Sequence, residues 1–144
     1  MEITAEKIMQ QLSAGTQVAG VIAVFGEAGY YKDKIAVALP RAGFGDAAPE
    51  DREITVFERD TDIKEISAAV NTYPFFSGRS LVIIKDEKLW GGKDGGEKRK
   101  QQQEELAELL ADVPEHCQVL LLGEKIDKRG KLYKSLLKAA AMVE

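Results

Sequence analysis

Cysteine and histidine are nearly absent from this sequence of 144 residues, which contains one of each. Cys117 cannot form an internal disulfide, and with only His116 beside it no tetrahedral zinc site can be completed. No serine, cysteine or histidine is placed as a nucleophile next to a partner base. Because a free cysteine is commonly buried, we interpret His116 and Cys117 as structural. Since neither a metal site nor a nucleophile is indicated, we expect no catalytic residue, metal or cofactor.

Long apolar runs are also missing. The longest, at residues 18–25, 81–84 and 119–122, have the length of strands, whereas a transmembrane helix needs roughly 20 apolar residues. The first seven residues lack the basic stretch and apolar run of a secretory signal. We therefore expect a cytoplasmic protein with no membrane partner.

An excess of positive charge is the third absence. The net charge is −4, whereas a dedicated nucleic-acid binder carries a clear basic excess for its phosphate contacts. The basic residues at 98–100 and between 125 and 138 are interpreted as solvated helix faces and helix ends. With 44% hydrophobic and 31% charged residues, the composition is globular, and we expect residues 1–144 to form a single domain.

Short β-branched runs alternate with amphipathic segments, which predicts βα units around a parallel sheet. The continuous apolar runs at 20–25 and 80–84 are typical of strands buried on both faces. A further strand is expected at 118–122, and the alternating segment 53–57 is expected nearer the sheet edge. The predicted fold class is therefore α/β, with a doubly wound, mainly parallel sheet.

Helix signals separate these strands. Thr4 is a good N-cap for a first helix that runs through Leu12. A second helix from about Tyr30 is expected to stop at Pro40 and the glycines after it. Asp62 with Glu65 resembles a capping box at the start of a third helix. Leucines predict two later helices, one closed by Pro114 and one running from about residue 128 to the chain end with Leu132, Leu136 and Leu137 inward. The glycine-rich segment 91–96 is expected to be mobile.

A glycine turn follows the first strand and leads into a helix, which is the geometry that holds phosphate in P-loop proteins. The turn contains Gly26, Glu27 and Gly29, and is followed by Tyr30 and Tyr31. It is shorter than a working P-loop and has no Ser or Thr after its lysine. Glu27 would repel phosphate and the two tyrosines would block a close backbone approach. We therefore interpret it as a degenerate P-loop with a structural role.

A second partial match to a nucleotide site follows the strand at 80–84. There Lys85, Asp86 and Glu87 resemble the acidic pair that holds magnesium and activates water in P-loop enzymes. Lys85 displaces the acidic pair from the end of the strand. The sequence also has no competent phosphate loop, so a magnesium ion at this pair would have no phosphate to act on. The match is therefore weak.

The connection at residues 71–79 holds three aromatic residues around a proline, where a surface segment is expected. Asn71, Tyr73, Pro74, Phe75 and Phe76 are its candidate site residues. Either a ring covers the strand end, or the rings are displayed to a partner, for which aromatic side chains are strong anchors. We expect at least one of Phe75 and Phe76 to be such an anchor.

Four segments, residues 24–31, 71–84, 119–122 and 126–132, together resemble the δ subunit family of the bacterial DNA polymerase III clamp loader, nearly end to end. The resemblance implies an AAA+-like N-terminal domain whose nucleotide site has decayed and which binds no ATP. It also implies that Phe75 and Phe76 form a hydrophobic wedge that enters a pocket of the β sliding clamp and opens it, flanked by Tyr73, Pro74 and Asn71. Phe75 and Phe76 are two aromatic residues at positions where some relatives have an aliphatic residue next to an aromatic one.

By the same resemblance, the family subunit continues into a lid and a collar domain, which this sequence lacks. The collar assembles with the ATPase subunits (γ/τ) and δ′, and the assembled complex acts on primed DNA. Two alternatives stay open: a divergent P-loop nucleotidase or kinase, and another non-catalytic clamp-loader-type interaction module. Magnesium-dependent ATP binding would favour the first, and failure to retain the clamp would favour the second.

Overall fold

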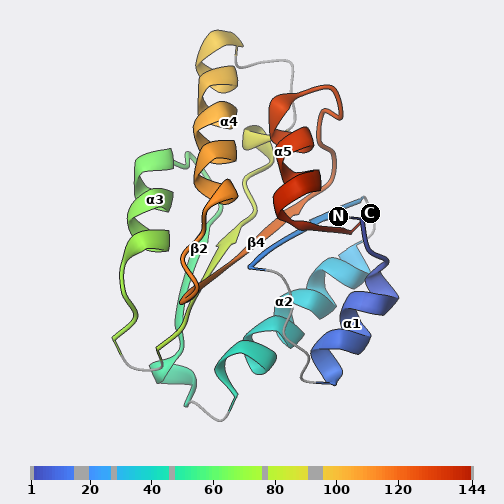
Figure 1. The fold of residues 1–144 in the computed structure, drawn as a ribbon, viewed down its shortest axis with the longest axis vertical. Helices are drawn as coiled ribbons and strands as arrows, with labels where there is room; N and C mark the ends of the chain where they lie inside the picture. Colours follow the sequence, from blue (N-terminus) through green and yellow to red (C-terminus); the bar gives the residue numbers. More distant parts are fainter. Residues whose placement is uncertain are drawn as a thin grey trace.

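A parallel β-sheet forms the centre of the molecule (Figure 1). The computed structural model describes residues 2–14, 20–26, 29–45, 48–75, 78–90 and 96–143. Within these ranges the sheet has five strands in the order β2-β3-β4-β1-β5, and every neighbouring pair is parallel. The strands are β1 (Val21–Phe25), β2 (Glu53–Phe57), β3 (Ser80–Ile84), β4 (Cys117–Gly123) and β5 (Ala141–Val143). The predicted doubly wound sheet, with 53–57 at its edge, is confirmed.

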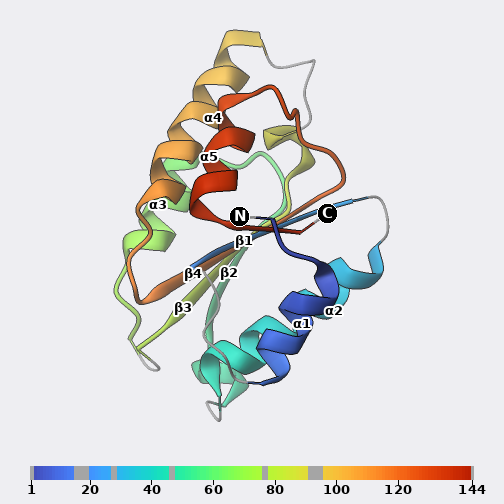
Figure 2. The same cartoon turned by 45° about the vertical axis from the view of Figure 1, so that its right-hand side comes forward.

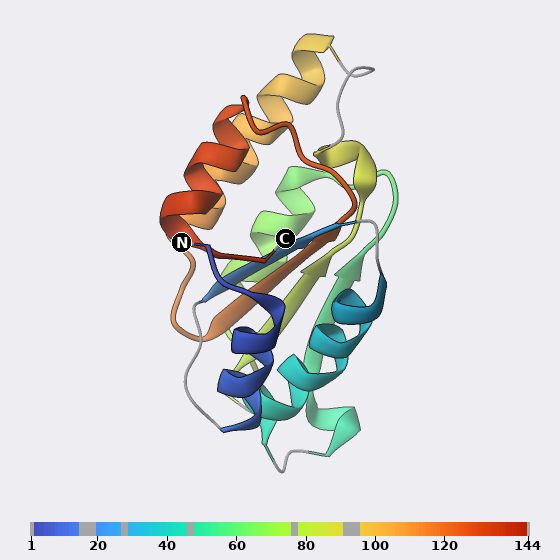
Figure 3. The same ribbon diagram turned by 90° about the vertical axis from the view of Figure 1, so that its right-hand side faces the viewer.

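Helices cover both faces of the sheet (Figure 2). On one face lie α1 (Ala5–Ser13) and α2 (Gly29–Phe44), side by side (Figure 3). On the other lie α3 (Ile63–Asn71), α4 (Gly96–Ala111) and α5 (Lys131–Ala139). Two short 3-10 turns, η1 (Pro49–Asp51) and η2 (Glu87–Leu89), complete the order. Each face has its own apolar cluster, so the core consists of two layers separated by the sheet.

The predicted helix starts at Thr4 and Asp62 are confirmed by side-chain capping. The Thr4 hydroxyl accepts a hydrogen bond from the backbone amide of Lys7 at 3.2 Å. Asp62 Oδ1 accepts one from the amide of Lys64 at 2.9 Å. Each bond satisfies an amide that has no partner within the helix.

The second helix, predicted to stop at Pro40 and the glycines after it, passes through the proline and stops only at the last of these glycines. Helix α2 continues through Pro40 to Phe44 and is followed by Gly45, whose φ is +56°. An interior proline costs a helix about 3 kcal/mol. Here Leu39 and Phe44, on either side of the proline, are both buried in the core, and their packing offsets that cost.

The C-terminal prediction needs two corrections. The last helix begins at Lys131 rather than near residue 128, because Asp127 closes a turn by accepting a hydrogen bond from the amide of Arg129 at 3.0 Å. It also does not run to the chain end, since β5 follows and pairs with β1. Of the three leucines expected inward, Leu137 is only partly buried, while Tyr133 enters the core. The segment 91–95, expected to be mobile, lies outside the described residues, and Gly96 begins α4.

Candidate functional site

The glycine turn lies at the carboxyl end of β1, where doubly wound sheets bind their ligands. The amide of Gly26 donates a hydrogen bond to the carbonyl of Gly123 at 3.1 Å, which ties the turn to β4. Glu27 lies outside the described residues, and Gly29 is the first residue of α2. The turn thus joins strand to helix as predicted.

Two tyrosines occupy the first turn of α2. The rings of Tyr30 and Tyr31 contact each other edge to face, with their centroids 5.1 Å apart. The Nζ atom of Lys34 lies 4.6 Å from the centroid of the Tyr30 ring, and a hydrogen bond with the Tyr30 side chain raises the pKa of Lys34. Bulky side chains therefore stand at the helix end that holds phosphate in P-loop proteins.

Trp90, which sequence reasoning missed, fills space at the carboxyl ends of β1 and β4. It is fully buried and contacts Phe25, the last residue of β1, edge to face with the ring centroids 5.6 Å apart. Both rings press against Gly123, where a Cβ atom would come within 2.8 Å of Phe25 Cε1. One signal was available, because Trp90 is the only tryptophan and follows a buried strand.

Asp86 has a structural role. It is buried, and its Oδ2 atom accepts hydrogen bonds from the hydroxyl of Thr61 at 2.8 Å and from the amide of Thr61 at 3.2 Å. Its Oδ1 atom accepts a third from the amide of Lys88 at 3.2 Å and so caps η2. Both oxygens of the carboxylate are therefore engaged by the protein itself.

Lys85 and Glu87 also have partners within the fold. The ammonium group of Lys85 pairs with the carboxylate of Glu58 at 2.9 Å and lowers the pKa of Glu58. Glu87 Oε1 accepts a hydrogen bond from the amide of Glu124 at 2.7 Å, while burial raises the pKa of Glu87. Each of the three residues after β3 thus contacts another part of the protein and supports the fold. Their match to a magnesium site stays weak.

At the opposite end of the sheet, residues 72–79 form the aromatic connection between α3 and β3 (lower left in Figure 1). The amide group of Asn71 donates to the carbonyl of Ser67 at 2.9 Å, and α3 ends there. Tyr73 is 75% exposed and Phe75 is 84% exposed, whereas Pro74 between them is buried. Phe76 lies outside the described residues. Of the expected site residues, the structure therefore brings Asn71, Tyr73 and Phe75 to the surface together.

Two neighbouring segments hold this connection. The backbone amide of Phe75 donates a hydrogen bond to Oε1 of Glu53, the first residue of β2, at 2.6 Å. On the other side, the ring of Tyr73 lies against the imidazole of His116, with the centroids 5.3 Å apart. The aromatic connection is thus fixed to the first residue of β2 and to the residue that directly precedes β4.

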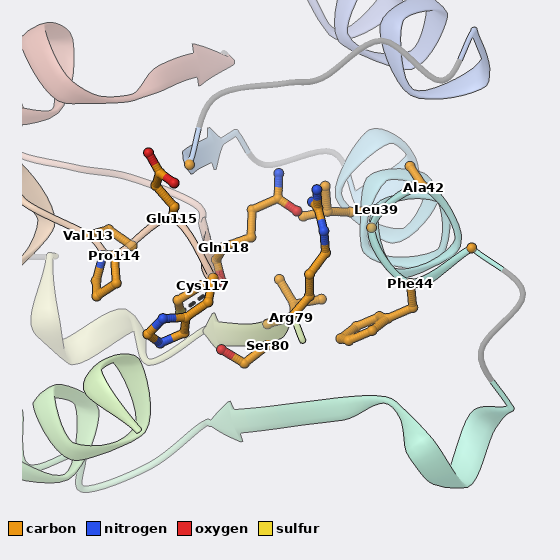
Figure 4. Close-up of a pocket in the computed structure, with 15 residues that line it drawn as sticks. Leu39, Ala42, Phe44, Arg79, Ser80, Val113, Pro114, Glu115, Cys117 and Gln118 are labelled. Atoms are coloured by element: carbon orange, nitrogen blue, oxygen red, sulfur yellow. Dashed lines mark hydrogen bonds between the residues drawn. The ribbon is translucent and has the colours of Figure 1, made fainter. Parts of the chain in front are cut away.

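A hollow of about 730 Å³ borders the aromatic connection, between the end of α2 and the amino ends of β3 and β4 (Figure 4). Arg79, His116, Cys117 and Gln118 are among the residues that line it. Burial raises the pKa of the Cys117 thiol, which disfavours the nucleophilic thiolate. The structural interpretation of His116 and Cys117 fits their positions, one against Tyr73 and the other in the core.

No group of three or more His, Cys, Asp or Glu side chains that could hold a metal ion occurs among the residues described above. Over the same ranges, no helix has both the length and the apolar character needed to cross a bilayer.

Comparisons with known proteins place these features in a family. Residues 44–144 match the family model described as DNA polymerase III, delta subunit. The DNA polymerase III subunit delta of Bacillus subtilis (strain 168) is 31% identical over 102 residues, which are 69% of this chain and 29% of that protein.

Solved structures agree with this match. The Bacillus subtilis DNA clamp loader delta protein superposes with a TM-score of 0.81 at 26% identity, over 98% of this chain and 42% of that one. A DNA polymerase III gamma subunit-related protein from Thermotoga maritima superposes with a TM-score of 0.63 at 16% identity, over 99% of this chain and 46% of that one, and shows the fold alone. The chain spans less than half the length of these relatives. By its match over residues 44–144, the chain belongs to the DNA polymerase III delta subunit family, a component of the clamp loader.

Proposed function

We propose that this chain is the part of a clamp-loader δ subunit that binds the β sliding clamp and opens it during DNA replication. The observation that carries the proposal is the 84% exposure of Phe75 beside the exposed Tyr73. An aromatic ring in water gains free energy when it enters an apolar pocket, and such rings are common anchors of interfaces. Phe75 and the adjacent Phe76 are the proposed wedge, with Tyr73, Pro74 and Asn71 around it.

Opening follows from a preference between two states of the clamp. If the wedge fits the distorted clamp interface better than the closed one, binding shifts the clamp toward the open state by that difference in affinity. No bond is made or broken in this step, so the domain needs no catalytic residue. Its role is mechanical coupling within a larger complex.

The domain is proposed to act without hydrolysing ATP itself. The tyrosines at the start of α2, the buried Trp90 and the fully engaged Asp86 support this part of the proposal. Other subunits of the loader (γ/τ) would bind ATP and assemble with δ′ through the collar domain of the family, and the assembled complex would act on primed DNA. The proposed place of action is the cytoplasm.

The first test is binding of the purified chain to its cognate clamp, measured by surface plasmon resonance. We expect Phe75→Ala to weaken binding at least about 30-fold, since truncating an anchor residue costs about 2 kcal/mol or more. The double variant Phe75→Ala with Phe76→Ala should abolish retention. Tyr30→Ala is the matched control, because Tyr30 is also an exposed aromatic, at 60%, but lies at the other end of the sheet.

The circular dichroism spectrum separates binding from folding. An unfolded double variant would mean that the rings belong to the core, and the wedge would be rejected. A folded wild-type chain that ignores the clamp would favour a different non-catalytic interaction module. Magnesium-dependent heat on titration with ATP would instead favour the nucleotidase alternative.

A further inference from the structure

Glu53, on a neighbouring strand, holds the backbone of Phe75, the described residue of the proposed wedge. It is the first residue of β2 and is paired in register with Ser80, the residue at which the aromatic connection enters β3. Its Oε1 atom accepts the hydrogen bond from the amide of Phe75 at 2.6 Å. A carboxylate that accepts from a backbone amide makes one of the stronger hydrogen bonds of proteins.

Little of the Phe75 side chain is buried in the domain, because 84% of the residue is exposed. The backbone that carries the ring therefore contributes to its direction. That backbone lies in a connection outside helix and strand, where Gly78 has a φ of +73°. Fixing the backbone of one residue in such a connection costs conformational entropy, which a partner would otherwise have to supply on binding.

We propose that Glu53 is a positioning residue for clamp binding, which fixes the Phe75 backbone so that the ring is presented before the partner arrives. The proposal rests on the proposed function of the aromatic connection and deepens it. Glu53 acts through Phe75, and the buried Pro74 and the contact between Tyr73 and His116 fix the preceding residues. Phe75 is thus held by the edge strand β2 as well as by the residues that directly precede it.

The decisive variants separate the hydrogen-bond acceptor from the charge. Glu53→Ala removes the acceptor, and we expect clamp affinity to fall about 5- to 30-fold, because binding would then have to fix the backbone of one residue. Glu53→Gln keeps an Oε1 acceptor without the charge and should restore affinity to within about twofold of wild type. Glu58→Ala is the matched control, since Glu58 directly follows β2 at its other end and pairs with Lys85.

A second measurement tests the mechanism in the free chain. Amide hydrogen exchange at Phe75, followed by NMR, should be faster in Glu53→Ala than in wild type and slow again in Glu53→Gln. Exchange in β3 and β4 should stay the same in all variants. A role limited to stability would instead change exchange throughout the sheet.

The outcomes distinguish this inference from the proposed function. If the wild-type chain does not bind the clamp, the proposed function fails and the inference with it. If Phe75→Ala weakens binding while Glu53→Ala does not, the function stands and the inference is overturned. Loss of affinity in Glu53→Ala without faster exchange at Phe75, or no recovery in Glu53→Gln, would also overturn it.

Discussion

The two ends of the sheet carry aromatic residues in opposite states. At the carboxyl ends of the strands, Trp90 and Phe25 are buried against Gly123, in the place where related folds bind ligands. At the amino ends, Tyr73 and Phe75 project into solvent. Aromatic residues are therefore packed into the core at one end and exposed to solvent at the other. Burial, rather than residue type, distinguishes the two ends.

Trp90→Ala should have the largest effect on stability and gives the sharpest test of that comparison. Removing a buried tryptophan costs about 3–5 kcal/mol, a large part of the stability of an ordinary domain. Phe75→Ala should change the free energy of unfolding by less than about 0.5 kcal/mol, because its ring is exposed. Urea denaturation of both variants measures the contrast. Equal losses would show that the ring of Phe75 packs in solution.

Gly123→Ala should have the next largest effect. Its added Cβ would press on Phe25 and Trp90, and overpacking of a core costs about 1–3 kcal/mol. Gly20→Ala is the control, since a Cβ at Gly20 meets no atom within 4 Å. Thermal unfolding of the pair is the measurement. A stable Gly123→Ala variant would mean that the carboxyl end of the sheet has room to spare, which would reopen the question of a ligand there.

Glu87→Gln should have the smallest effect, and it depends on pH. Burial raises the pKa of Glu87 above its ordinary value of 4.5, so the folded chain favours the protonated form. The resulting stabilisation is complete at low pH and is lost as pH rises through the folded pKa. At pH 7 the charge of Glu87 therefore opposes folding, and a glutamine, which still accepts from Glu124, should raise Tm slightly.

Calorimetry at pH 7 and at about pH 3 checks the sign, because the difference between variant and wild type should shrink once Glu87 is protonated. Glu58→Gln offers the contrast. The hydrogen bond and charge of Lys85 lower the pKa of Glu58, so its carboxylate favours folding at neutral pH and the variant should be less stable there. A Glu87→Gln variant that is less stable at pH 7 would contradict the assignment.

Much of the fold could be predicted from apolar patterns, because a parallel strand buried on both faces needs a continuous apolar run. The missed parts lack such a pattern. Strand β5 has three residues, too few to show a period, and its pairing with β1 comes from tertiary contact. The passage of α2 through Pro40 likewise depends on the burial of Leu39 and Phe44, which local sequence does not report.

The candidate site was predictable only in its location. A proline among aromatic residues in a connection marks an unusual surface, but whether the rings face water depends on the packing around them. The hydrogen bond between Glu53 and Phe75 joins residues 22 apart in sequence, through the register of β2 against β3. Trp90 was missed because one aromatic after a strand has no period, and only its complete burial shows its role.

The position of β2 at the sheet edge has a consequence for how tightly a partner can bind. Within the described ranges β2 pairs with β3 alone, so it is held on one side, and edge strands open locally more readily than central ones. Each such opening would release Glu53 from Phe75. The apparent dissociation constant would then equal the intrinsic one divided by the fraction of molecules in which the edge is closed, a fraction that amide exchange along β2 can measure.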